Sequence, residues 1–94
     1  MDVYVVTISD AESNTIVSIH RTYESALKVW NDERENIIRN IKKTIDALEQ
    51  REQYNWLKDE MYTRMIKNLQ CEDPKIIDNY PHETPNIIKY ELYD

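Results

Sequence analysis

The stretch that decides the fold is YESALKVWNDERENIIRNIKKTIDALEQ, which occupies residues 23–50. On a helical wheel at about 100° per residue, its large apolar side chains fall within one arc about 100° wide. The arc contains Tyr23, Leu27, Trp30, Ile37, Ile38, Ile41, Ile45 and Leu48. Because the phase never slips, the pattern predicts one long helix over 23–50. The alternative is a break at DERE (32–35), which resembles a capping box and would start a second helix.

Arg34 lies inside this apolar arc. A long basic side chain can bury its stem against apolar neighbours while its charged head stays in water. The other interpretation is a buried or intersubunit ion pair. Of the two, we favour the first interpretation.

The residues before the long helix predict a β-hairpin over 3–21. Both alternating sets of the first strand, 3–9, are largely apolar, which is typical of a central strand or of one covered on both faces. A polar turn follows at 10–14, where Asn14 is the best substitute for a glycine in a left-handed conformation. The second strand, 15–21, places Val17 and Ile19 on one face and Ser18 and His20 on the other.

The residues after the long helix predict a second helix over 54–70, an acidic, proline-containing loop over 71–85 and a strand over 86–93. Pro74 ends the second helix, since the residue before a proline disfavours the α region. The order is therefore β-β-α-α-β. It predicts a single α+β domain over 1–94, with a small three-stranded antiparallel or mixed sheet and both helices on one face.

The predicted long helix is too long for its sheet. A helix of about 26 residues spans roughly 39 Å, whereas seven-residue strands span about 23 Å. The apolar arc continues into the overhang, so the sequence predicts homodimerisation through the helices. The residues expected at that interface are Arg34, Ile41, Ile45 and Leu48.

Composition argues against several classes of function. The chain has no glycine, so it has no glycine-rich phosphate loop and no glycine-flanked nucleophile elbow. His20 and His82 lack metal-ligand spacing, and two carboxylates next to Cys71 disfavour its thiolate. We therefore expect no enzymatic activity, no metal and no cofactor. The single cysteine and the lack of a long apolar run or a basic N-terminal region predict a cytoplasmic protein without membrane contact.

Charge is concentrated at the two ends of the chain. Residues 71–94 carry a net charge of −4 and residues 1–22 a net charge of −2, whereas 23–70 are neutral. A balanced helix without a basic stripe argues against direct nucleic-acid binding. The acidic ends could together form a surface that contacts a basic site on another protein, but residue by residue the sequence favours the simpler interpretation that mild acidity serves solubility. The candidate partner-binding residues, which include two aromatic markers, are Glu72, Asp73, Asp78, Tyr80, Glu83 and Trp56.

Three segments resemble the hairpin-plus-helix module of small phage proteins: VYVVT (3–7), IVSI (16–19) and YESALKVW (23–30). The run DPKIIDNYP (73–81) is also phage-like. Some proteins of this kind are early host-takeover or anti-defence factors. The resemblance implies a protein that inhibits a host protein in the host cytoplasm, with an acidic surface competing against nucleic acid as one version. The alternatives are a small ligand-binding or enzymatic domain and a structural subunit of a phage particle.

Overall fold

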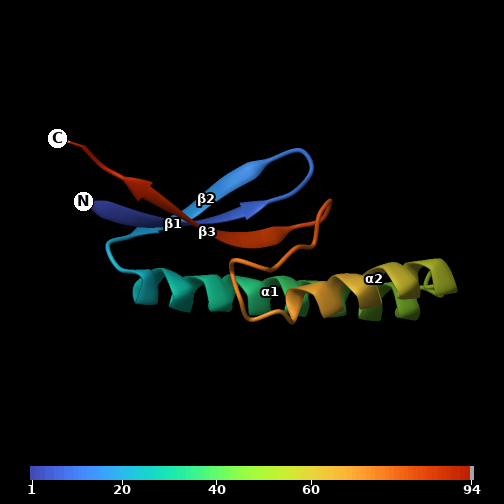
Figure 1. The fold of residues 1–94 in the computed structure, drawn as a ribbon. Coiled ribbons are helices and arrows are strands. Elements are labelled where there is room, and N and C mark those ends of the chain that lie inside the picture. The colour runs from blue at the N-terminus through green and yellow to red at the C-terminus, as the bar shows by residue number, and fades with distance from the viewer. Residues whose placement is uncertain (94) are drawn as a thin grey trace.

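The computed structural model describes residues 1–93 and has the α+β arrangement that the sequence predicts (Figure 1). The elements are β1 (Asp2–Ser9), β2 (Asn14–His20), α1 (Tyr23–Gln50), α2 (Trp56–Leu69) and β3 (Thr84–Glu91). Both helices lie on one side of the sheet, and α2 packs against α1. The last strand begins two residues earlier than expected, and the second helix begins two residues later.

The sheet has the order β2-β1-β3, and both pairings are antiparallel. The central position of β1 agrees with its two apolar faces. Val5 lies opposite Ile19 on one side and Ile88 on the other. The register with β2 shifts between Val6 and Thr7, because β2 contains one extra residue, Val17, between the partners of these two residues. Beyond such a bulge, each residue of the strand points to the opposite face from the one that strict alternation predicts.

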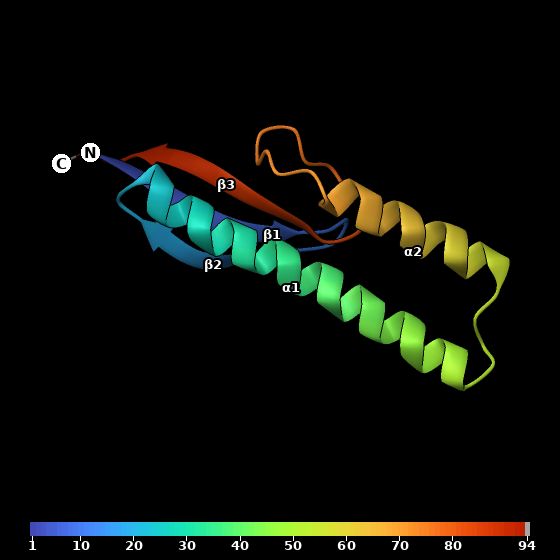
Figure 2. The same cartoon turned by 90° about the horizontal axis from the view of Figure 1, so that it is seen from below.

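α1 is one unbroken helix of 28 residues, so the predicted single helix is confirmed and the restart at residue 32 is wrong. The side chain of Thr22 accepts a hydrogen bond of 3.2 Å from the backbone N–H of Ser25, which satisfies one free donor of the first turn. The helix crosses beneath the sheet and continues beyond it together with α2 (Figure 2). The predicted overhang is therefore present, and the molecule measures 57 × 22 × 19 Å.

The core lies between α1 and the sheet. Its buried residues are Val6, Ala26, Trp30, Ile37, Ile41, Leu69 and Ile77. Trp30 is fully buried, and its indole Nε1 donates a hydrogen bond of 2.8 Å to the carbonyl oxygen of Pro85. This bond joins the first third of α1 to the start of β3, so the helix and the sheet are held together by both burial and a directional contact.

The segment between α2 and β3 is fixed by two buried side chains. Ile77 belongs to the core, and the backbone N–H of Asn79 donates a hydrogen bond of 3.1 Å to the Thr84 hydroxyl. The Asn79 amide also donates to the Glu83 carbonyl at 3.0 Å. These contacts hold residues 77–84 in a defined position against the sheet.

The connection between the helices contains the one residue with positive φ within residues 1–93, Glu52, at 55°. The prediction that Asn14 takes the left-handed conformation is therefore wrong. The hairpin closes through Asp10 instead, whose carboxylate accepts hydrogen bonds of 2.8 Å from the backbone N–H groups of Glu12 and Ser13. An Asx turn of this kind closes the loop without a left-handed residue.

Candidate protein-binding surface

The two faces of the sheet differ in what covers them. Tyr4, Val6 and Ile8 of β1 point toward the helices and pack in or against the core. Val5 is 6% exposed yet lies outside that core cluster, which places it on the opposite face. Both ribbon views show α1 and α2 on the same side of the sheet and no element over the other side (Figures 1 and 2).

We call this uncovered side the outer face. Its residues follow from the register, because directly paired residues project to the same side. The outer face consists of Val3, Val5, Thr7, Ile16, Ile19, Asn86, Ile88 and Tyr90. None of these positions carries a charge, although 32% of the chain is charged. Ile16 and Ile19 are each 64% exposed and Tyr90 is 51% exposed, so the face presents large apolar side chains to solvent.

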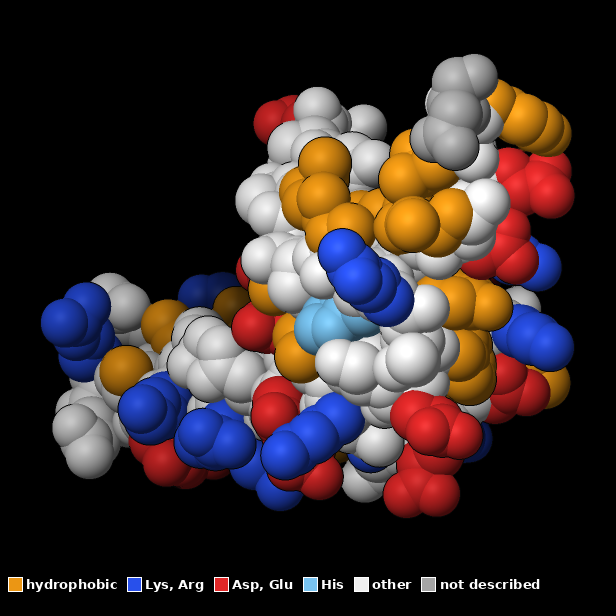
Figure 3. Space-filling model, turned by 90° about the vertical axis from the view of Figure 1, so that its left-hand side faces the viewer, with side chains coloured by type: hydrophobic (Ala, Val, Ile, Leu, Met, Phe, Trp, Pro, Cys, Tyr) orange, Lys and Arg blue, Asp and Glu red, His pale blue; other side chains and the backbone are white. Residues whose placement is uncertain are grey.

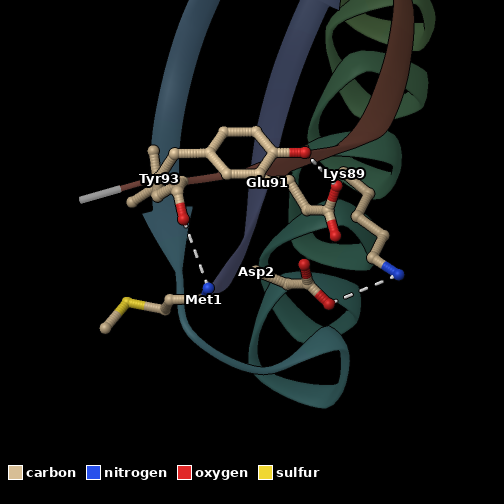
Figure 4. A network of polar contacts seen from close by, with 6 residues as sticks. Met1, Asp2, Lys89, Glu91 and Tyr93 are labelled. Atoms are coloured by element: carbon tan, nitrogen blue, oxygen red, sulfur yellow. Dashed lines mark hydrogen bonds and ion pairs between the residues drawn. The ribbon is translucent and has the colours of Figure 1, made fainter.

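The charged residues of the strands lie on the helix side. Asp2 and Lys89 form an ion pair of 3.4 Å, and the Tyr93 hydroxyl donates a hydrogen bond of 2.8 Å to Glu91 (Figure 4). Asp2, Lys89 and Glu91 share the alternation of Tyr4, which faces the core. In the space-filling view, hydrophobic side chains gather over the upper part of the molecule with acidic side chains beside them, and charges of both signs surround the part below (Figure 3). Within the paired strands, the charged residues therefore lie on the helix side and the outer face has none.

Sequence reasoning missed Ile16 because of the bulge. Simple alternation puts Ile16 and Ile19 on opposite faces, but the extra residue Val17 brings both to the outer face. The available signal is compositional: the stretch SNTIVSI (13–19) has no charged residue and no proline. Such a stretch on an edge strand is unusual, because edge strands commonly carry charges or prolines.

The six predicted partner-binding residues do not form one surface. Trp56, at the first turn of α2, is 72% exposed. It is the first residue of α2, which is about 21 Å long, and the 71–85 loop follows the other end of this helix. Figure 2 shows these two ends of α2 well apart. Glu72, Asp78, Tyr80 and Glu83 are exposed on that loop, and Asp73 is half-buried at the end of α2. Asp78 accepts a hydrogen bond of 3.0 Å from the Tyr80 backbone N–H.

Glu83 does contribute to a cleft of about 490 Å³ between the helical hairpin and one end of the sheet, which we call the acidic cleft. Its lining includes the carboxylates of Asp10, Glu12 and Glu83, and no lysine or arginine. The backbone N–H of Ala11 donates a hydrogen bond of 3.1 Å to the carbonyl of Pro81, which joins the two loops that carry these acids. Backbone hydrogen bonds from Glu12 and Ser13 lower the pKa of Asp10, so its charge persists into moderately acidic solution.

Of the four predicted dimer residues, two lie inside the monomer. Ile41 is buried in the core, and Arg34 is 6% exposed. Arg34 Nη1 donates a hydrogen bond of 2.9 Å to the carbonyl of Leu69. The guanidinium is therefore buried, and the prediction that it stays in water is wrong. No carboxylate within residues 1–93 pairs with it. Ile45 and Leu48, farther along the overhang, are half-buried. Dimerisation through the helices therefore stays a prediction that depends on the overhang alone.

The comparisons with known proteins add no relative. No family model, no curated protein and no solved structure matches the chain. None of the helices in the described part of the chain combines the length and hydrophobicity that crossing a membrane requires.

Proposed function

We propose that this protein acts by binding another protein, and that the outer face of its sheet is the contact surface. The observation that supports this function is the lack of charge across the outer face of a highly charged chain. In a sheet with one face in solvent, the strand residues that point to that face are normally polar. Exposed apolar patches of this kind on small proteins mark interaction sites.

The exposed side chains give the surface its binding energy. Covering a large aliphatic or aromatic side chain completely contributes about 1.5–3 kcal/mol. Ile16, Ile19 and Tyr90 each retain half or more of their exposure, so a partner gains about 1–2 kcal/mol from each. Tyr90 also carries a hydroxyl that can form a hydrogen bond at the edge of the contact. A complementary partner presents an uncharged, apolar surface of similar size.

The partner that we propose is a host protein, which the chain inhibits by occupying its surface. This part of the proposal rests on the resemblance of the segments 3–7, 16–19, 23–30 and 73–81 to small phage proteins. Inhibition by occlusion requires no catalytic group on the inhibitor. It requires only an interface that a rigid element presents, and the outer face is built on three paired strands.

The acidic cleft supports a second mode of binding, in which carboxylates compete with nucleic acid for a basic site. Three carboxylates around apolar side chains suit a lysine or arginine, whose stem is apolar and whose head is cationic. The two modes differ in their response to salt. Contact through exposed charges weakens as ionic strength rises, whereas apolar contact persists.

The experiment captures partners from a bacterial lysate on the wild-type protein, on two surface variants and on one control variant, at low and high salt. Ile19→Lys places a charge on the outer face, and Glu12→Gln/Glu83→Gln neutralises two acids of the cleft. Ile76→Lys is the matched control, because Ile76 is 70% exposed but lies outside both surfaces.

We expect one dominant partner that survives high salt, is lost with Ile19→Lys and is retained by Ile76→Lys. Loss with the glutamine variant alone, together with salt sensitivity, would favour the acidic cleft. Retention by every variant would contradict both surfaces. Higher-order assembly of the isolated protein in light scattering would instead favour a structural subunit of a particle.

A further inference from the structure

A second cavity lies on the helix side of the sheet, between the start of α1, strands β1 and β3, and the segment after α2. Its volume is about 340 Å³. The lining residues are Tyr4, Tyr23, Pro74, Lys75, Ile87 and Lys89. We call it the aromatic pocket. It shares no residue with the acidic cleft or with the outer face, so its chemistry is independent of the function proposed above.

The walls of the aromatic pocket are apolar and aromatic. The rings of Tyr4 and Tyr23 meet edge to face, with centroids 5.7 Å apart and an interplanar angle of 73°. Ile87 packs against the core from β3, and Pro74 closes the pocket from the segment after α2. Ring edges and faces arranged in this way favour another aromatic ring over an aliphatic chain, because aromatic pairs gain from offset and edge-to-face contact.

The charged side chains that line the pocket are both basic, although the formal net charge of the protein is −6. Lys75 and Lys89 are its charged lining residues, and no carboxylate lines it. Lys89 forms its ion pair of 3.4 Å with Asp2, and both partners are partly exposed (Figure 4). Asp73 is nearby, where its carboxylate accepts a hydrogen bond of 2.9 Å from the Lys75 backbone N–H. A partly exposed pair is weak, so a ligand anion can compete for the Lys89 ammonium.

The pocket is held open by anchored elements. Tyr4 and Ile87 lie on paired strands, and Tyr23 is the first residue of α1. The turn that carries Pro74 is closed by hydrogen bonds from the backbone N–H groups of Ile76 and Ile77 to the Asp73 carbonyl, at 3.1 and 3.0 Å. The residues of such a site are already fixed before a ligand binds, which reduces the entropic cost of binding.

We propose that the aromatic pocket binds a small aromatic carboxylate, with the ring against Tyr4 and Tyr23 and the carboxylate between the ammonium groups of Lys75 and Lys89. Size agrees with this ligand class. A closed cavity of about 150 Å³ holds benzene, and ligand sites begin at about 300 Å³. The 340 Å³ pocket therefore accommodates one ring with a short carboxylate chain.

The test is a titration of the isotopically labelled full chain with 3-phenylpropionate, followed through its backbone amide resonances. We expect shifts at Tyr23, Lys75 and Lys89, with a dissociation constant on the order of 1 mM for a ligand of this size. The uncharged 3-phenylpropanamide should bind at least ten-fold more weakly, and acetate, which lacks the ring, should produce no saturable shift.

Two variants separate the charge from the fold. Lys75→Gln/Lys89→Gln should weaken 3-phenylpropionate about ten-fold and leave 3-phenylpropanamide unchanged, whereas Lys43→Gln, at an exposed position in the overhang, should change neither. Equal affinity for the acid and the amide would overturn the proposal. So would shifts confined to Ile16 and Ile19, since the ring would then be adsorbing to the outer face.

Discussion

Arg34 in the middle of α1 donates a hydrogen bond of 2.9 Å from Nη1 to the carbonyl oxygen of Leu69, the last residue of α2. The last carbonyls of a helix have no intrahelical partner and carry partial negative charge. A buried guanidinium therefore finds its counter-charge in a helix end. Its plane also lies over the Trp30 ring at 5.4 Å, and its second amino group donates to the Asn31 side chain at 3.3 Å.

Replacing Arg34 should destabilise the fold. Arg34→Met keeps much of the apolar stem but leaves the buried Leu69 carbonyl without a donor, which costs about 1–3 kcal/mol. Urea denaturation measures the free energy of unfolding. The control is Arg39→Met on an exposed position of the same helix, which should change that free energy by less than about 0.5 kcal/mol. Equal effects of the two substitutions would show that the Arg34–Leu69 contact contributes nothing.

The two tryptophans should report on opposite environments. Trp30 is fully buried and Trp56 is 72% exposed. Trp56→Phe should leave blue-shifted emission that iodide scarcely quenches, whereas Trp30→Phe should leave red-shifted emission that iodide quenches readily. Trp30→Phe should also cost about 1–3 kcal/mol, because the buried Pro85 carbonyl loses the indole donor. Similar quenching of both variants would contradict the placement of Trp30 in the core.

Tyr54 should be hard to ionise. Partial burial of the phenol, followed by its hydrogen bond of 2.8 Å to the Asp59 carboxylate, raises the pKa of Tyr54 to about 12 from the ordinary 10.0. The protonated Tyr54 phenol therefore stabilises the folded state. Because its pKa is higher in the folded than in the unfolded protein, this stabilisation is complete below pH 10 and is lost as the pH rises through 12. Absorbance at 295 nm should show a late titration step that Tyr54→Phe removes. Asp59→Asn should move the step to lower pH, and an unmoved step would contradict the role of Asp59.

Replacing Glu52 with glycine should stabilise the fold. A non-glycine residue with a φ of 55° is strained by about 1–2 kcal/mol, and glycine removes this strain while losing about 0.5–1 kcal/mol of chain entropy. Glu52→Gly should therefore raise the free energy of unfolding by up to about 1 kcal/mol. Gln53→Gly, next to it and without positive φ, should lower that free energy. Two substitutions with the same sign would contradict the assigned backbone conformation.

Self-association through the overhang is the last prediction. Leu48 is half-buried in the monomer, and covering its remaining surface favours a second copy. Sedimentation equilibrium should give twice the monomer mass of 11.4 kDa for the wild type and the monomer mass for Leu48→Glu. Ala47→Glu, at the exposed neighbouring position, should remain dimeric. A monomeric wild type at about 100 μM would exclude a stable helical interface.

The sequence predicted the long helix well because a helical phase is local information. A wheel over residues 23–50 needs no knowledge of the rest of the chain, and the apolar arc agrees with the buried positions Trp30, Ile37 and Ile41. The partner of Arg34 could not be predicted in the same way. Leu69 is 35 residues away, and only the return of α2 along α1 brings its carbonyl to the guanidinium.

The candidate surface was less predictable for two physical reasons. Both faces of β1 are apolar, so the alternation of Val5 and Val6 does not say which face meets the helices. The bulge at Val17 then shifts the alternation within β2, which hid the outward position of Ile16. The sequence shows that the acidic residues lie near the two ends of the chain. It does not show where they lie in space, because this depends on the antiparallel pairing of β1 with β3.

The order of the sheet makes folding and recognition separable. On β1, Val6 is fully buried against the helices and Val5 is 6% exposed between Ile19 and Ile88, so both faces of the central strand are limited by packing. Tolerance to substitution should therefore differ between strands: β1 is limited by solubility and yield, whereas Ile16, Ile19 and Tyr90 on the two flanking strands are limited by complex formation. Natural variants can then change partners through β2 and β3 while the central strand keeps the scaffold intact.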